Sequence, residues 1–254
     1  MRFKVVLQVC LVLAGVAMVG SALILGMRYI REAQVERQIL AALPTRDIIA
    51  RTNELKRIRG SHPEETAAIV CKLLESPDQQ VRRSISRDIL SLCEGSQVEA
   101  ALIKNLGSNH DHAVRLGCAI HLMSRHSPAV RDAYIRALHD PYDKVVQIAV
   151  GELGYRGGSE AKEALNATLS HPSWRVRLEV CKALITSKYA DDRTVSTLEE
   201  MRYEPEAAQY DAEIEEMDRD NREMESRGLQ AGEMWGNLNR IIGQAKNIAA
   251  QNRH

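Results

Sequence analysis

The chain has 254 residues, and its 34 basic and 34 acidic side chains give a formal net charge of zero. This balance excludes the strongly basic proteins that attract nucleic acid through charge alone, so we expect no nucleic-acid partner. One Phe and two Trp disfavour a β-sandwich or barrel, whereas abundant Ala, Leu, Ile and Val favour closely packed helices. The predicted fold class is therefore all-α.

An uncharged apolar segment runs from residue 5 to residue 27. At about 1.5 Å per residue, a helix of this length spans roughly 30 Å, the thickness of the hydrocarbon core of a bilayer. We therefore predict that residues 1–27 form a single-pass transmembrane anchor in contact with the lipid bilayer. A cleaved signal peptide is the alternative, since Gly20-Ser21-Ala22 resembles a cleavage site, but apolar residues continue beyond it to Met27.

Basic residues flank the apolar segment on both sides, with Arg2 and Lys4 before it and Arg28 and Arg31 after it. Because the two sides are nearly equal in charge, the sequence predicts a membrane protein but leaves open the side of the soluble domain. Residues 28–60 are predicted to form juxtamembrane and capping helices, which stand the following repeats off the bilayer and cover their open end.

Two series of apolar residues recur along residues 61–203, and the second series starts again every 31 to 33 residues. Their spacing of four residues marks the buried stripe of a helix. The first series contains Val70 and Leu74; Val98, Leu102 and Leu106; Val130, Tyr134 and Leu138; and Ala161, Leu165 and Leu169. The second contains Val81, Ile85 and Ile89; Val114, Cys118 and Leu122; Val145, Ala149 and Leu153; and Val176, Val180 and Leu184. Each pair of helices predicts one helical hairpin, about four in all.

Short polar turns separate the two helices of each predicted hairpin, such as Ser76-Pro77-Asp78 and His171-Pro172-Ser173. Asp and Ser side chains accept hydrogen bonds from the free amides of a starting helix, and Pro is tolerated in its first turn. Turn residues and apolar spacing therefore predict the same hairpins.

These units resemble HEAT-like repeats, especially the short repeats found in phycobilisome lyases. The likeness depends on the Asp/Ser-Pro turn and on a Val-Arg pair that opens the second helix, at Val81-Arg82, Val114-Arg115 and Val176-Arg177. Val145-Val146 departs from this pattern. The resemblance implies an α-solenoid of helical hairpins, preceded here by one transmembrane helix, that presents a surface to a protein partner. Accordingly, we expect a membrane-anchored scaffold or adaptor and not an enzyme.

Basic residues of the second helices and one aromatic residue are the candidates for partner binding. The predicted protein-binding residues are Arg82, Arg83, Arg115, Trp174 and Arg177. The alternative for the arginines is pairing with acidic residues within the stack, and for the Trp it is burial at a turn.

The sequence contains no recognisable catalytic motif, so no catalytic residue is predicted. Histidines gather between His110 and His139, but they lack the paired His-Glu motifs of the HEAT-repeat enzyme deoxyhypusine hydroxylase, and we expect exposed turn residues and no metal site. The cysteines show no metal-binding spacing, and no cofactor is expected; they are Cys10, Cys71, Cys93, Cys118 and Cys181. A lyase-like or metal-dependent enzyme built on the same repeats remains the alternative function.

Residues 204–254 differ in composition from the repeats, with an acidic, helix-prone first part and a mildly basic end. We predict an acidic helix followed by a carboxyl-terminal tail. Either the tail is a frayed end, or it is an amphipathic segment that binds a partner.

Overall fold

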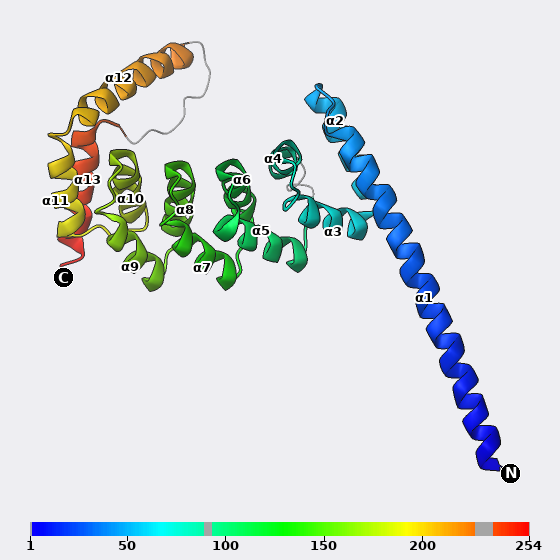
Figure 1. The fold of residues 1–254 in the computed structure, drawn as a ribbon. Coiled ribbons are helices and arrows are strands. Elements are labelled where there is room, and N and C mark those ends of the chain that lie inside the picture. The colour runs from blue at the N-terminus through cyan, green and yellow to red at the C-terminus, as the bar shows by residue number, and fades with distance from the viewer. Residues whose placement is uncertain (1, 89–92, 227–235, 254) are drawn as a thin grey trace. The chain divides into compact units, whose positions relative to one another are not determined.

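The computed structural model describes residues 2–88, 93–226 and 236–253, and it gives only the backbone of residues 2–17 and 220–226. Regular structure in the described residues is entirely helical, from α1 to α13, which confirms the predicted fold class (Figure 1). The chain divides into two compact units, residues 1–121 and 122–254. Each unit is described by itself below.

Unit 1 begins with the long helix α1, and five shorter helices follow it. They are α1 (Arg2–Ala42), α2 (Ile48–Ser61), α3 (Pro63–Leu73), α4 (Gln79–Asp88), α5 (Ser96–Ser108) and α6 (His112–Leu122), of which the last residue belongs to unit 2. Helix α3 packs against α1, α2, α4 and α5. The predicted stripe residues Val70, Leu74, Ile85 and Val98 are buried. Val81 is only half-buried, and Ile89 lies outside the described residues.

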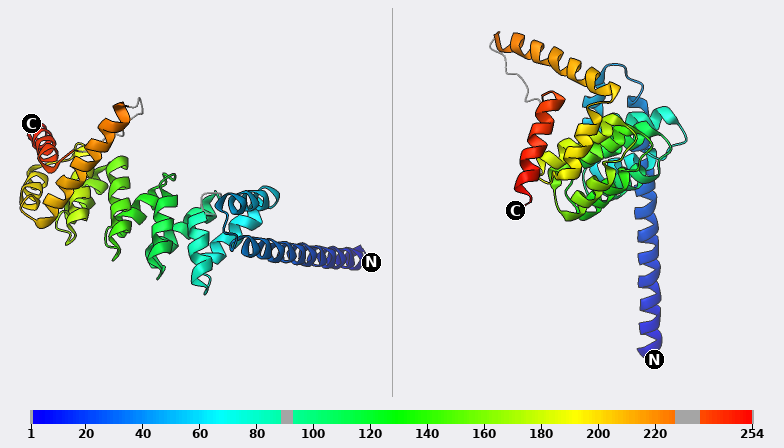
Figure 2. Two further views of the ribbon diagram at one scale, coloured as in Figure 1. Left: turned by 90° about the horizontal axis from the view of Figure 1, so that it is seen from above. Right: turned by 90° about the vertical axis from the view of Figure 1, so that its left-hand side faces the viewer.

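Helix α1 has two different parts. From Met18 to Ile30 its large apolar side chains are 53% to 74% exposed, whereas Val35, Ile39 and Ala42 are buried beside α2 and α3. Both views in Figure 2 show the amino-terminal part of this helix lying apart from α2 and α3. From Met18 to Ile30 the helix therefore has no cover from the described residues of unit 1, while its carboxyl-terminal part belongs to the helical core.

The predicted membrane anchor falls on α1. Among the described residues, no helix is both long and apolar enough to cross a membrane. Residues 5–17 of the predicted span at 5–27 have no described side chains.

Unit 2 contains two complete hairpins, a closing pair of helices and one helix outside the pairs. The helices are α7 (Pro128–Ala137), α8 (Asp143–Arg156), α9 (Ser159–Thr168), α10 (Trp174–Thr186), α11 (Asp192–Met201), α12 (Pro205–Ser226) and α13 (Leu238–Gln251). Helices α7 and α8 pack together, as do α9 and α10, and the second helices α8 and α10 make the most extensive contact in the chain. All predicted stripe residues of these hairpins are buried.

Helix α13 lies in the segment that the sequence assigns to an acidic helix and tail, yet it packs against α10 and α11 (Figure 1). Leu238, Ile241, Ile242, Ala245 and Ala249 form its buried stripe. Asn252, just beyond its end, donates hydrogen bonds to the carbonyl oxygens of two residues after α10, at 3.0 Å each. Thus α11 and α13 form the last pair of the stack, and α12 is inserted between them in the sequence.

Candidate functional site

Three of the predicted binding residues form hydrogen bonds with the turn that precedes their own helix. The Nη1 atom of Arg82 donates to the carbonyl oxygen of Ser76 at 2.6 Å, that of Arg115 to Asn109 at 2.9 Å, and that of Arg177 to His171 at 2.8 Å. Arg115 is only 9% exposed. In each case the acceptor lies six residues before the arginine, so the guanidinium group satisfies a carbonyl of the turn that precedes its helix. The Val-Arg pair therefore has a structural role in the hairpin.

A fourth arginine makes the same contact and was missed by the sequence analysis. The Nη1 atom of Arg51 in α2 donates to the carbonyl oxygen of Thr45 at 2.9 Å, and its Nη2 atom lies 3.2 Å from a carboxylate oxygen of Asp88 in α4. Both side chains of this ion pair are buried. The available signal was its spacing, since Arg51 precedes Arg82 by 31 residues, the length of one repeat. The end of α1 and the whole of α2 therefore form an additional helical hairpin.

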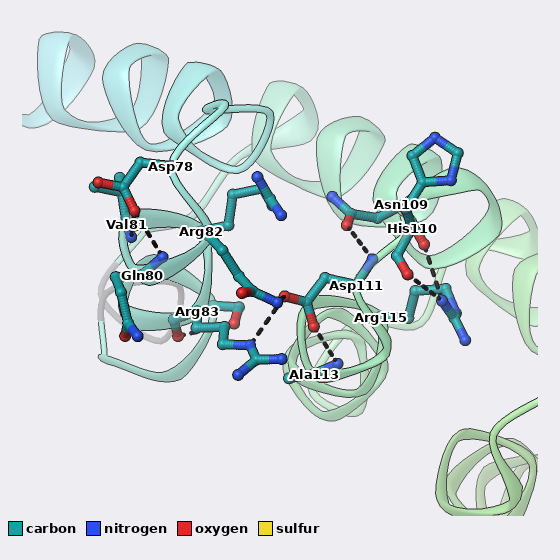
Figure 3. Close-up of polar contacts among 12 residues, drawn as sticks. Asp78, Gln80, Val81, Arg82, Arg83, Asn109, His110, Asp111, Ala113 and Arg115 are labelled. Carbon is teal, nitrogen blue, oxygen red and sulfur yellow. Dashed lines mark hydrogen bonds and ion pairs between the residues drawn. The ribbon is translucent and has the colours of Figure 1, made fainter.

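Arg83, the fourth predicted arginine, reaches the next hairpin. Its Nε atom donates to Asp111 at 2.9 Å, and Figure 3 shows the two side chains pointing toward each other. The same carboxylate accepts from Gln79 at 3.1 Å and from the backbone amide of Ala113, where it caps α6. Although burial alone would raise the pKa of Asp111, the hydrogen bonds from Arg83, Ala113 and Gln79 lower it overall. Arg83 is 40% exposed, so its outer face remains open to a partner.

Trp174 is buried at the start of α10 and not displayed on the surface. Its Nε1 atom donates to the carbonyl oxygen of Met201 at 3.2 Å, and its ring lies 5.6 Å from that of Tyr210 at an angle of 53°. This is the burial at a turn that the sequence left as the alternative. One edge of the ring still borders a cavity of about 330 Å³, which is lined by residues of α8, α10 and α12.

The cavity combines an apolar floor with compensated charges. Arg175 pairs with Glu213 at 3.0 Å, and Lys182 pairs with Glu179 at 3.1 Å. The Lys182 ammonium also lies 5.1 Å from the centre of the Tyr210 ring, a cation-π contact. Burial, together with nearby carboxylates, raises the pKa of Tyr210 to about 12, so this hydroxyl stays protonated at neutral pH. The cavity is therefore suited to holding an apolar side chain beside paired charges.

In the part of the chain that the structure describes, the histidines and cysteines considered in the sequence do not cluster into a metal-binding group. His110 borders a cavity of about 360 Å³ with Arg82 and Lys104, and His139 is exposed. Among the described residues, no three His, Cys, Asp or Glu side chains are grouped to hold a metal ion. Burial raises the pKa of Cys118 and Cys181 to about 12, which keeps both thiols protonated.

One comparison with known proteins supports the helical hairpins of unit 2. A family model described as HEAT repeats matches residues 132–216. This range lies within unit 2, so HEAT-like repeats are confirmed there. Among solved structures, an engineered protein from a structural genomics consortium is similar at 15% identity, with 87% of this chain and 96% of that chain covered and a TM-score of 0.41. No curated protein matches the chain.

Proposed function

We propose that the chain is a membrane-tethered helical-repeat scaffold that binds a protein partner on its second helices. The exposed apolar part of α1 is the observation that carries this proposal. Side chains such as Leu23, Ile24 and Leu25 point outward on consecutive positions around this helix, and each is more than 60% exposed. A surface that is apolar on all sides is unfavourable in water and favourable in a lipid bilayer.

The tether is continuous with the repeats. Helix α1 runs without interruption from Arg2 to Ala42, and its end forms the first helix of the additional hairpin with α2. Lys72 of α3 also pairs with Glu36 of α1, at 2.8 Å. A repeat built onto the anchor helix itself is held close to the bilayer, as suits a scaffold that presents its partner near a membrane.

Partner binding is supported by the HEAT-repeat match and by the charged positions that the second helices leave exposed. Of the five predicted binding residues, Arg83 has a side chain that is 40% exposed, whereas Arg115 and Trp174 are buried. Lys144 and Arg175 are exposed on the second helices of unit 2. We therefore propose that these three basic residues contact the partner, while Arg82, Arg115 and Arg177 support the helices that carry them.

Membrane tethering is tested by flotation of the full chain with lipid vesicles. The double variant Leu23→Arg/Leu25→Arg should lose flotation, because two charges in the apolar helix make its insertion unfavourable. Ile48→Arg/Ile49→Arg is the matched control, since these two residues are equally exposed but lie outside the apolar segment. Wild-type chain that fails to float, or that floats regardless of the first substitution, contradicts the tether.

Partner binding is tested by photo-crosslinking in native membranes. A crosslinking amino acid at Arg83, Lys144 or Arg175 should give one discrete protein adduct. The same amino acid at Arg136 and Glu163, which are exposed on the first helices α7 and α9, should give none. Adducts that form equally at both sets of positions, or at neither, contradict a binding surface on the second helices.

A further inference from the structure

Helix α12 has no place in the stack of hairpins. Helices α11 and α13 pair with each other, and α13 also packs against α10. Between α11 and α13, helix α12 contributes 22 residues, and its sequence is strongly acidic. Helix α12 meets the start of α13, where Asp211 accepts from the backbone amide of Leu238 at 2.8 Å and Tyr210 donates to the carbonyl oxygen of Gly236 at 3.2 Å. These contacts with the start of α13 do not account for the position of α12 on α10.

The first half of α12 lies against the exposed face of α10. The Tyr210 ring is tilted against that of Trp174, Glu213 pairs with Arg175, and Ile214 lines the cavity beside Leu178. Tyr210 and Ile214 are four residues apart, and Met217 follows three residues later, so the three residues form one apolar stripe. This is the geometry with which an amphipathic helix docks into a groove of another protein.

The charges of the two faces are complementary. Helix α10 offers Arg175 and Lys182 at the edges of an apolar strip, and α12 offers Glu213 to the arginine and the Tyr210 ring to the lysine. The opposite side of α12, with Glu215, Glu216 and Asp218, is exposed. Arg175 thus favours an acidic helix over a basic one, whereas the charge of Lys182 is already paired with Glu179 of its own helix.

This contact is much less extensive than that of α13. Helix α13 buries five residues along its length. On α12, Ala207 and Ile214 are the described buried residues, and Met217 remains 49% exposed above the cavity. The incomplete cover leaves the cavity of about 330 Å³ between the helices. A short, partly filled contact of this kind can be replaced by a better-fitting helix.

We propose that the face of α10 formed by Trp174, Arg175, Leu178 and Lys182 is a docking surface for an acidic amphipathic helix of the partner, and that α12 occupies it within the chain. The inference rests on the proposed partner binding and names the chemistry of the partner. An aromatic residue, an aliphatic residue four positions later and an acidic residue between them fit this surface. The partner helix displaces α12 and fills the cavity more completely.

The test uses a fluorescent peptide of residues 205–219 and the full chain in detergent. The variant Glu213→Arg places two cations together and weakens the contact of α12 with Arg175. Its chain should bind the peptide at least tenfold more tightly than the wild type does. Glu216→Arg is the matched control, because it makes the same charge change on the exposed side of α12 and should leave peptide binding at the wild-type level.

A charge exchange establishes where the peptide binds. Adding Arg175→Glu to the Glu213→Arg chain should weaken binding of the native peptide at least tenfold. A peptide that carries Glu213→Arg should restore the binding. With Trp235→Phe as background, Trp174 is the single tryptophan, and its emission should change with each binding event.

Equal binding of the peptide to the Glu213→Arg chain and to the wild-type chain would overturn the inference, as would peptide binding that Arg175→Glu leaves unchanged. Glu213 is 41% exposed, so its substitution should preserve the fold, which circular dichroism verifies. Because no cellular partner is used, failure here is distinct from failure of the crosslinking experiment.

Discussion

The two units join their second helices by different means. In unit 1, α2 is tied to α4 by the buried pair of Arg51 and Asp88, and Arg83 of α4 pairs with Asp111 at the start of α6. In unit 2, α8 and α10 meet through apolar side chains, and Gly154 lies so close to Ala183 that a methyl group would be 2.7 Å from its Cβ atom. The same repeat pattern therefore supports both a charged and an apolar junction.

This difference determines which changes each unit can tolerate. A buried ion pair makes stability sensitive to substitution, because removal of one partner leaves the other charged and without a counterion. An apolar junction tolerates changes in pH and salt but not added volume. We therefore expect unit 2 to respond mainly to the size of side chains. Unit 1 should respond to charge and pH as well as to size, because Gly117 of α6 lies similarly close to Ser86 of α4.

The largest expected effect is at the buried pair of unit 1. Arg51→Ala removes both the counterion of Asp88 and the brace on Thr45, and Arg87 replaces the lost charge only in part, from a more exposed position. We expect a loss of about 3 kcal/mol in the free energy of unfolding. Hydrogen exchange of the full chain should show lost protection in α2 and α4. Lys56→Ala, an exposed change on the same helix, is the control, and equal effects of both variants would contradict a special role of the pair.

Two glycines of one helix test the junction of unit 2. Gly154→Ala adds a methyl group against Ala183, and we expect it to destabilise α8 and α10 by about 2 kcal/mol. Gly151→Ala has no atom within 4 Å of its new methyl group and should stabilise the helix by about 0.5 kcal/mol. Urea unfolding monitored by circular dichroism compares the two variants. A change of the same sign in both would mean that close approach does not govern this junction.

The Asp111 carboxylate gives unit 1 a pH dependence. Its pKa is lowered in the folded chain from the ordinary value of 3.8, so the unfolded chain takes up the proton first as the pH falls. The stabilisation is therefore fully present above pH 4 and is lost as the pH falls below that value toward the folded-state pKa. At pH 7, Asp111→Asn should cost about 1.5 kcal/mol, because the bond from the Arg83 guanidinium loses its charge.

Thermal unfolding of both chains, followed from pH 7 to pH 3, measures this dependence. The difference between wild type and Asp111→Asn should shrink as the wild-type carboxylate is protonated. A difference that remains constant over this range would contradict a charge-dependent stabilisation by the Asp111 carboxylate.

The apolar spacing was sufficient to predict the hairpins but not the direction of their polar side chains. Val114, Cys118 and Leu122 are buried as predicted, because residues four apart necessarily share one side of a helix. Arg115, next to Val114, was predicted to bind a partner, yet it reaches back to Asn109. An arginine at this position of the helix can either bind a partner or hydrogen-bond the preceding turn. The sequence is the same for both roles, and only the three-dimensional path of the turn decides between them.

Pairing across an insertion was also beyond the sequence. The buried stripe of α13, from Leu238 to Ala249, has ordinary helical spacing and could have been found. That this helix pairs with α11 while α12 is passed over depends on contacts between distant residues, which spacing does not encode. The docked position of α12 on Trp174 was missed for the same reason.

The smallest expected effect separates burial from charge as the source of stability in unit 1. Lys104 and Glu75 form an ion pair of 2.6 Å, shorter than that of Arg51 and Asp88, but their side chains are 63% and 49% exposed. Water already solvates both groups, so Lys104→Ala should change the free energy of unfolding by less than about 0.5 kcal/mol. The measurement is urea unfolding at low and high salt, beside Arg51→Ala. A loss at Lys104 comparable to that at Arg51 would mean that the number of ion pairs, and not their burial, stabilises the unit.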